Sequence, residues 1–268
     1  MDPRLLLIFL FGFLGGIGAF FIGAPLPFML GGIFGAASFV LYFERDGRQL
    51  PRVSRWVRLV AMSVIGSMIG ARFSPELLPL LPQFWISGLA ILPFILVAHG
   101  GSYLFMRRLG GYRRLDAYFA SLPGGIVDSA VLAEQAGADL RIVTVQHFIR
   151  IILVVVSVPL LFLFVQGDVV GSLAGETIAT ATYDNVDVLL ILTIAMAGLA
   201  VGRWTGLPVS HMMVPLLFSL VLSVSGTVDI NIPAWLAHLA QFLIGSSLGA
   251  QFSGLSRGML VKLSLIHI

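Results

Sequence analysis

The polar residues that could do chemistry gather in one stretch, Ser121–Arg150, inside a chain that is otherwise apolar. A Pro-Gly-Gly sequence interrupts the backbone there, so some N–H and C=O groups cannot bond within a helix. In lipid, such groups are tolerated only where protein or a water-filled cavity satisfies them, which makes this stretch the default functional site. The candidate ligand-binding residues are Pro123, Gly124, Gly125, Asp128, Glu134, Gln146, His147 and Arg150.

Arg150 is the charge in this stretch that most needs a partner. It lies about eight residues into the apolar segment Val143–Val165, roughly 12 Å deep at 1.5 Å per residue. An isolated charge at that depth costs about 2.5 kcal/mol or more. We therefore expect Arg150 to pair with Asp128 or Glu134.

Gln146 lies one helical turn before Arg150 on the same face, and His147 lies beside that face. We hypothesise that this cluster binds an anionic or zwitterionic solute, with the helix N–H groups after Gly125 adding positive potential. Two plainer interpretations stay open. Arg150 could form an ion pair that only holds the hairpin, or Pro-Gly-Gly could only start a helix whose charges lie at the membrane surface. We assign Asp139 to a helix cap near the surface, because a new span begins after it.

The composition predicts that lipid is the solvent for most of the chain. Of the 268 residues, 58% are hydrophobic and 11% charged, and the mean hydropathy is +1.00. Soluble domains carry about 25% charged residues. We therefore expect an all-α polytopic membrane protein.

The net charge of +3 does not indicate a nucleic-acid partner, because the arginines fall in short loops between apolar spans, where they set orientation. The absence of cysteine excludes disulfides, thiolate ligands and cysteine nucleophiles. We interpret His99, His211 and His238 as packed, hydrogen-bonded residues without metal-ligand spacing. No nucleophile–base pair or phosphate loop is present, so we expect neither an enzyme nor a cofactor.

Apolar runs predict about eight transmembrane helices. They are Leu5–Ile22, Leu26–Phe43, Val57–Phe73, Phe84–Met106, Val143–Val165, Val186–Gly202, Leu207–Val224 and Trp235–Phe252. The first run could also be a signal peptide. We reject that alternative because the run has a counterpart later in the chain.

The basic residues predict the orientation of these spans. With the N-terminus in the cytoplasm, every Lys and Arg except Arg72 and Arg150 is cytoplasmic or at a cytoplasmic helix end. This layout requires Tyr118–Arg141 to enter and leave on the same side, as a re-entrant or broken-helix hairpin around Pro-Gly-Gly. A full crossing is the alternative, but it would set the later loops against the positive-inside rule.

The sequence also matches itself at two places. Ile65–Ser74 aligns with Ile244–Ser253 at an offset of 179, with seven of ten residues identical, and Gly23–Met29 aligns with Gly206–Met212 at an offset of 183. The loop after the second span is rich in arginine, whereas its counterpart after Val224 contains no Lys or Arg. The two copies should therefore have opposite orientation. Inverted repeats with broken helices are typical of many secondary transporters.

The repeat predicts the domain organisation. We expect residues 1–166 to form a first repeat and residues 186–262 an incomplete second one, whose own Pro-Gly-Gly would fall at about position 302. Leu263–Ile268 is similar to the in-frame translation of a common sequencing-adapter end, so we interpret it as an artefact and the chain as a fragment.

With these motifs in view, the chain resembles the AbrB family of bacterial inner-membrane proteins. The resemblance rests on Leu122–Gly125, on Gly137–Asp139, on the run Thr144–Arg150 that follows, and on the repeated glycine-spaced spans. It implies a location in the inner membrane and a second Pro-Gly-Gly hairpin, which this sequence lacks. Members are described as regulators of gene expression, and some as related to ammonia monooxygenase.

The leading interpretation is a transporter-like protein that moves or senses a small solute at the hairpin. A membrane-embedded regulator that acts through a cytoplasmic partner is the alternative, and a monooxygenase subunit is disfavoured. The expected partners are the lipid bilayer and an unidentified small solute, without direct contact to nucleic acid. Assembly into a homo-oligomer stays open.

Overall fold

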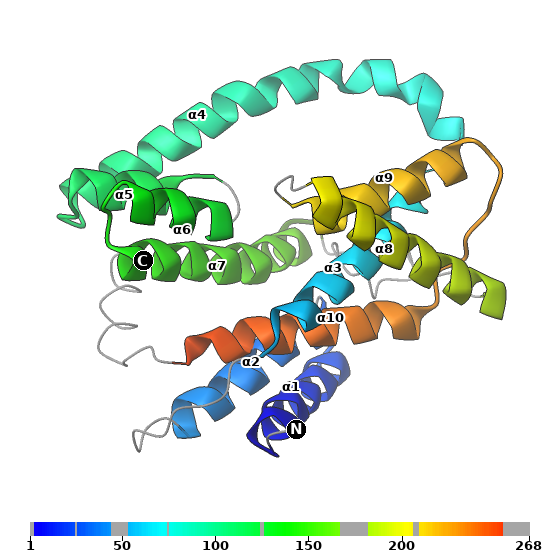
Figure 1. Cartoon of the computed structure of the whole chain (residues 1–268), viewed down its shortest axis with the longest axis horizontal. Helices are drawn as coiled ribbons and strands as arrows, with labels where there is room; N and C mark the ends of the chain where they lie inside the picture. The colour runs from blue at the N-terminus through cyan, green and yellow to red at the C-terminus, as the bar shows by residue number, and fades with distance from the viewer. Residues whose placement is uncertain are drawn as a thin grey trace. The chain divides into compact units, whose positions relative to one another are not determined.

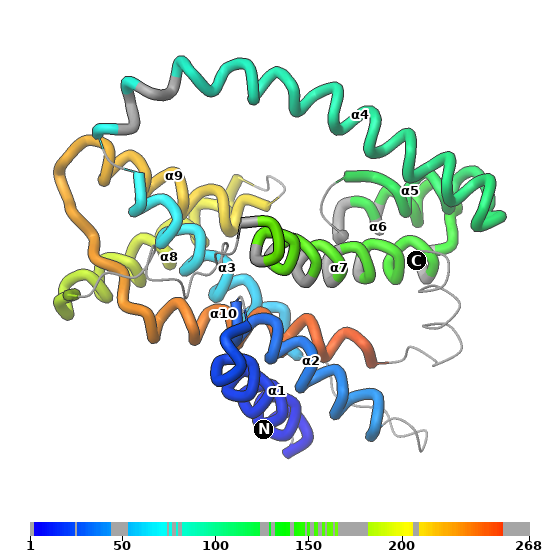
Figure 2. The backbone as a smooth tube through the Cα atoms, turned by 180° about the vertical axis from the view of Figure 1, so that it is seen from behind, coloured from blue at the N-terminus to red at the C-terminus, as the bar shows by residue number. Residues whose placement is uncertain are grey.

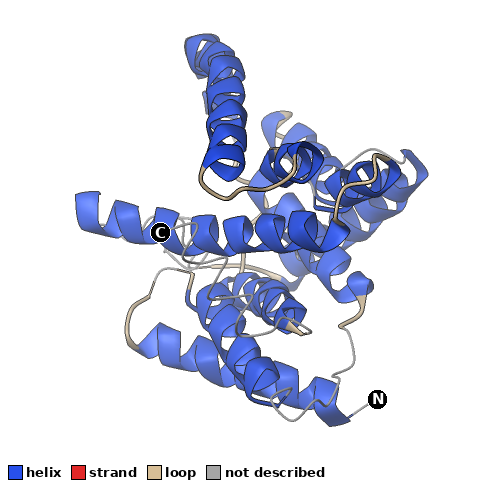
Figure 3. Ribbon diagram, turned by 90° about the vertical axis from the view of Figure 1, so that its left-hand side faces the viewer, coloured by secondary structure: helices blue, strands red, loops and turns tan. Residues whose placement is uncertain are grey.

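The computed structural model describes residues 3–24, 26–43, 53–73, 75–123, 126–166, 182–205 and 209–253. Within them the elements are all helical, without strands (Figures 1 and 3). In order they are α1 (Pro3–Phe21), α2 (Pro27–Phe43), α3 (Arg55–Gly70), the 3₁₀ helix η2 (Pro75–Phe84), α4 (Trp85–Arg108), α5 (Arg114–Ser121), α6 (Ile126–Gln135), α7 (Leu140–Gln166), α8 (Asn185–Thr205), α9 (Ser210–Val224), α10 (Ala234–Gly249) and the 3₁₀ turn η3 (Ala250–Phe252). The all-α fold class is confirmed.

Three helices of the described part are long and apolar enough to cross a membrane, namely Pro3–Phe21, Pro82–Arg108 and Asn185–Thr205. The α4 helix shows the physical reason most clearly, because Phe94, Leu96 and Val97 are each at least 70% exposed. Side chains of this kind in water would lose the free energy that burial normally supplies. The long apolar helices therefore indicate association with a membrane.

Each predicted span overlaps a helix of the described part. Pro75–Phe84, between the third and fourth predicted spans, forms a 3₁₀ helix. Its internal residues Pro79 and Pro82 lack an N–H group, so a regular α-helix would lose hydrogen bonds there.

The chain divides into two compact units. The first, Met1–Pro75 with Val156–Leu255, contains α1, α2, α3, α8, α9 and α10. Within it α2 packs on α1 and α10, and α9 packs on α8 and α3, while α3 and α10 contact each other. Figures 1 and 2 show α3 and α10 running in opposite directions.

Glycines let these helices approach closely. A Cβ atom added to Gly66 of α3 would lie within 3.0 Å of the Met212 carbonyl of α9. A Cβ added to Gly245 of α10 would lie equally close to the Met29 carbonyl of α2. Only glycine permits backbones to pack at this distance. Each contact joins a helix from one half of the sequence to a helix from the other half.

The second unit, Glu76–Val155 with Ser256–Ile268, contains η2, α4, α5, α6 and the first part of α7. Its core is formed by Met106, Ala117, Ala120, Ala133 and Val143, which come from all four α-helices. Three of the five are alanine, so the short helices α5 and α6 pack with little side-chain volume between them.

Candidate functional site

The predicted break at Pro-Gly-Gly is present. The α5 helix ends at Ser121, Leu122 leaves the helical region with φ −54° and ψ 127°, and α6 begins at Ile126. A proline disfavours helical backbone in the residue before it, which explains why the helix stops at Leu122. Gly124 and Gly125 lie outside the described residues.

The broken end of α5 is satisfied by side chains. The Ser121 hydroxyl donates to the Tyr118 carbonyl at 3.0 Å, and Nδ1 of His99 in α4 lies 3.1 Å from the Ser121 carbonyl. Nη1 of Arg150 in α7 donates to the Leu122 carbonyl at 2.8 Å. These contacts supply partners for carbonyls that a continuous helix would have satisfied internally. The positive guanidinium also lies at the negative end of the α5 dipole.

Among the described residues, Arg150 thus has a backbone partner, and its expected pairing with Asp128 stays a prediction. Glu134 is exposed, and the ion pair recorded among the described residues joins Arg113 and Asp116 instead. The side chain of Asp128 lies outside the described part of the chain. A helix carbonyl is an acceptor that every residue carries, so no sequence signal marks Leu122 as the partner of Arg150.

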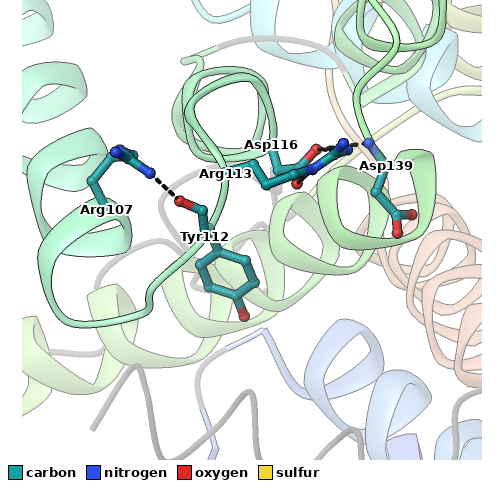
Figure 4. Close-up of polar contacts among 5 residues, drawn as sticks. All are labelled: Arg107, Tyr112, Arg113, Asp116 and Asp139. Atoms are coloured by element: carbon teal, nitrogen blue, oxygen red, sulfur yellow. Dashed lines mark hydrogen bonds and ion pairs between the residues drawn. The ribbon is translucent and has the colours of Figure 1, made fainter.

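A second polar junction closes the other end of the hairpin (Figure 4). The carboxylate of Asp116, 2% exposed, accepts from Nε and Nη2 of Arg113 at 2.8 and 3.0 Å and from the backbone N–H of Asp139 at 2.8 Å. Asp139 is exposed and directly precedes α7, which is where we expected a helix cap. Asp116 thus connects the start of α5 to the start of α7.

The electrostatics of this junction follow from its geometry. The hydrogen bonds from Arg113 hold the pKa of the Asp116 carboxyl below its usual range, while burial opposes that shift and the Asp139 amide reinforces it. The same contact raises the pKa of Arg113. Both groups are therefore charged near neutral pH.

A tight turn precedes this junction. Nη1 of Arg107 donates to the Tyr112 carbonyl at 2.6 Å (Figure 4). Gly111 has φ +66°, a conformation that glycine adopts without steric cost. The turn directs the chain from α4 into α5, and the hydroxyl of Tyr112 reaches α7.

The face of α7 before Arg150 is polar and buried. Gln146 is 2% exposed and His147 is fully buried. Nε2 of Gln146 donates to the Tyr112 hydroxyl at 3.3 Å, and Nδ1 of His147 lies 3.0 Å from the Val143 carbonyl. Oε1 of Gln146 forms no hydrogen bond among the described residues, and Nε2 of His147 has no partner at hydrogen-bond distance there, although the Leu122 carbonyl lies near that imidazole. Buried polar atoms of this kind ordinarily have a partner, so a bound solute or water could supply one here.

The structure thus brings together four of the predicted positions: Pro123, beside the break, and Gln146, His147 and Arg150 on α7. Glu134 is exposed on α6. No group of three or more His, Asp or Glu side chains suited to a metal ion occurs in the described ranges.

Three residues of the site had not been selected from the sequence, namely His99, Tyr112 and Asp116. The only usable signal was the Arg113-x-x-Asp116 spacing, which places both side chains on one side of a helical turn. His99 was expected to be packed and hydrogen-bonded, and its bonds to Ser121 and edge-to-face contact with Tyr118 confirm this.

The matching family model and one of two similar proteins name the same family. A family model described as "Transition state regulatory protein AbrB" matches residues 28–267. The chain is similar to "Putative regulator AbrB" of Escherichia coli K12, with 27% identity over 88% of this chain and 66% of the relative. It is also similar to "Uncharacterized protein YhjN" of Bacillus subtilis 168, with 26% identity over 77% of this chain and 58% of the relative.

The chain therefore spans less than two thirds of the length of either relative. Neither relative is named as an enzyme. No solved structure matches the chain.

Proposed function

The chain belongs to the AbrB family, and from that membership we propose that it is a transporter-like membrane protein that binds a small anionic or zwitterionic solute at the Pro-Gly-Gly hairpin. One observation carries the proposal. Arg150 donates a hydrogen bond to the broken end of α5, and on the same face of α7 the buried atoms Oε1 of Gln146 and Nε2 of His147 have no partner at hydrogen-bond distance among the described residues.

The spacing on α7 supports this assignment. Val143, Gln146, His147 and Arg150 follow the i, i+3, i+4, i+7 pattern of one helix face. This face would present an acceptor, an imidazole nitrogen and a guanidinium to the same volume. A solute with a carboxylate or phosphate group would pair with Arg150, and an ammonium or hydroxyl group would suit Oε1 of Gln146.

The helix ends at the break support the same chemistry. The α6 helix begins at Ile126, so the N–H groups of its first turn have no partner within the helix. Helix N-termini attract anions, and discontinuous helices in secondary transporters direct these ends at substrate groups. Arg150 already compensates the negative end of α5, which leaves the positive end of α6 for the solute.

The packing of the first unit supports an inverted repeat. Gly66 meets Met212 and Gly245 meets Met29, and these two contacts are related by the offsets of 179 and 183 that align the sequence with itself. The corresponding helices α3 and α10 run in opposite directions (Figure 1). A twofold axis that relates antiparallel membrane helices lies in the membrane plane, which is the symmetry of inverted-repeat transporters.

We propose eight spans on this basis, with a cytoplasmic N-terminus and a re-entrant hairpin. In the full-length protein, single cysteines at Gly125, Ser129 and Asp139 test the hairpin, because the chain itself contains no cysteine. Labelling of Asp139→Cys only from the cytoplasm, with Gly125→Cys protected by solute, is the expected result. Labelling of Asp139→Cys only from outside would establish a full crossing and overturn both the hairpin and the inverted repeat.

Solute flux separates this proposal from the alternative. The family description and the name of the E. coli relative favour a regulator that acts through a cytoplasmic partner. Full-length protein in proteoliposomes, supplied with a panel of labelled amino acids and small carboxylates, should accumulate at least one of them. Absence of flux, together with capture of a protein by the loop Arg45–Arg58, would favour the regulator.

A further inference from the structure

A second group of basic side chains lies on the first unit, far in sequence from the hairpin residues. Arg55 and Arg58 occupy the first turn and a half of α3, Arg203 lies in the last turn of α8, and His211 lies in the first turn of α9. We refer to these four residues with Trp56 as the Arg203 cluster. Its members come from both halves of the sequence.

The contacts within the cluster define one surface. Cζ of Arg203 lies 4.4 Å from the centroid of the Trp56 ring, in a cation–π contact. Arg55 and Arg58 flank Trp56 on the first turn of α3. The Ser63 hydroxyl donates to the His211 carbonyl and connects α3 to α9. The three helix ends are therefore held together.

The described residues provide no charge to balance this cluster. The first turns of α3 and α9 contain no acidic residue, and the ion pair recorded in the described ranges joins Arg113 and Asp116 of the second unit. Helix N-termini carry partial positive charge, so arginines in the first turn of α3 add to an unfavourable potential. A bound anion would remove that repulsion.

Aromatic side chains indicate where this anion lies. Trp56 is 46% exposed and Trp204 is 88% exposed. Exposed tryptophans at the ends of apolar helices are typical of the headgroup level of a bilayer. Val201 near the end of α8 and Val209 before α9 are also exposed, as suits a surface in contact with lipid.

From these contacts we propose that the Arg203 cluster binds the headgroup phosphate of an anionic phospholipid. Arginine guanidinium groups bind phosphate with two parallel hydrogen bonds. Basic sites between membrane helices are suited to anionic headgroups. The bound lipid would join α3 to α8 and α9. This inference concerns the first unit and does not depend on solute binding at the hairpin.

Quenching of tryptophan fluorescence by brominated lipid tests the proposal. The Trp85→Phe/Trp235→Phe variant of the full chain retains Trp56 and Trp204 as its only indoles. In mixed micelles with phosphatidylcholine, brominated phosphatidylglycerol should quench this fluorescence at a lower mole fraction than brominated phosphatidylcholine. The half-quenching fraction is the mole fraction of brominated phosphatidylglycerol that quenches half of the fluorescence. Adding Arg58→Gln and Arg203→Gln should raise this fraction by about 25-fold, since each basic side chain near anionic lipid increases the affinity about fivefold.

A matched control carries the same loss of charge elsewhere. Arg108→Gln/Arg114→Gln changes two exposed arginines of the second unit and should leave the half-quenching fraction within about twofold of the parent. If the double variant of the cluster does not fold, Arg203→Gln alone, with competition by unbrominated phosphatidylglycerol, gives the same comparison.

Three outcomes would overturn the proposal. Equal quenching by the two brominated lipids would show that the surface has no preference for anionic headgroups. Full displacement by inorganic phosphate would assign the cluster to a soluble anion. Displacement by a poly-glutamate peptide would assign it to an acidic protein partner.

Discussion

Nη1 of Arg150 donates to the carbonyl oxygen of Leu122 at 2.8 Å, across 28 residues of sequence. The contact gives an otherwise costly charge a partner and gives the broken end of α5 a donor. It uses one of the five N–H groups of the guanidinium. Arg150 can therefore hold the hairpin and still contact a solute.

Variants of Arg150 should separate these two roles. Arg150→Ala should lower the free energy of unfolding by about 1–3 kcal/mol, because the Leu122 carbonyl loses its donor in a poorly solvated site. It should also abolish solute binding. Arg150→Lys should recover most of the stability, since an ammonium can donate to the carbonyl, but not the bidentate contact to the solute.

Thermal unfolding in detergent and solute uptake by full-length protein measure the two effects. Unchanged uptake in Arg150→Ala would contradict the binding role. Loss of stability and uptake to the same degree in both variants would leave Arg150 with a structural role only.

Gln146→Met should reduce function with little loss of stability. The substitution removes the 3.3 Å hydrogen bond from Nε2 to Tyr112 but also removes a buried Oε1 without a partner in the described residues, so the unfolding free energy should change by about 1 kcal/mol or less. Solute affinity should fall because the acceptor is lost. Binding is measured by the solute-induced shift in melting temperature.

Gln241 of α10 offers a matched control. It is fully buried, and neither Oε1 nor Nε2 has a partner among the described residues. Gln241→Met should likewise leave stability nearly unchanged, but it should preserve solute binding. Equal loss of binding in both variants would argue against a site on α7.

Alanine at the two close glycine contacts should be strongly destabilising. A Cβ at Gly66 or Gly245 would press on a backbone carbonyl of the neighbouring helix, and such overpacking costs about 1–3 kcal/mol. Gly88→Ala is the control, because its Cβ would meet nothing within 4 Å and alanine favours a helix by about 1 kcal/mol. If Gly66→Ala and Gly245→Ala have the same unfolding free energy as Gly88→Ala, the close packing of α3 on α9 and of α10 on α2 is wrong.

The helices could be predicted closely because their limits follow local chemistry. The predicted run Leu26–Phe43 corresponds to α2 at Pro27–Phe43, and Val143–Val165 lies within α7 at Leu140–Gln166. Arginine, proline and glycine bound these runs, and a membrane fixes the length that an apolar run needs. The number of spans and the inverted repeat remain predictions.

The site could be predicted only in part. Intramembrane polar residues identified the hairpin and α7, because charge is costly in lipid wherever it lies. The eight-residue helix α5 was not foreseen from Arg114, since so few residues carry little periodicity. The partner that Arg150 has among the described residues is a backbone carbonyl, and tertiary packing alone decides which of many identical carbonyls it meets.

The junction at Asp116 predicts a pH dependence of stability. The pKa of Asp116 is lower in the folded chain than in the unfolded one, chiefly because Arg113 donates to the carboxylate. The unfolded state therefore takes up the proton first as the solution is acidified. The contribution of Asp116 to the free energy of unfolding is complete above the pKa of about 3.9 in the unfolded chain, and it is lost as the pH falls through the lower pKa in the folded chain.

Unfolding measured between about pH 5 and pH 2 should show this loss in the parent chain, and Asp116→Asn should remove that component of the slope. Glu134→Gln, which neutralises an exposed carboxylate of α6, should retain it. Arg113→Gln should also flatten the slope, because the carboxylate then loses the donor that lowers its pKa. If the change in unfolding free energy of the double variant Arg113→Gln/Asp116→Asn differs from the sum of the two single changes, the two side chains act as a pair. Additive effects would mean that Asp116 stabilises α7 through the Asp139 amide alone.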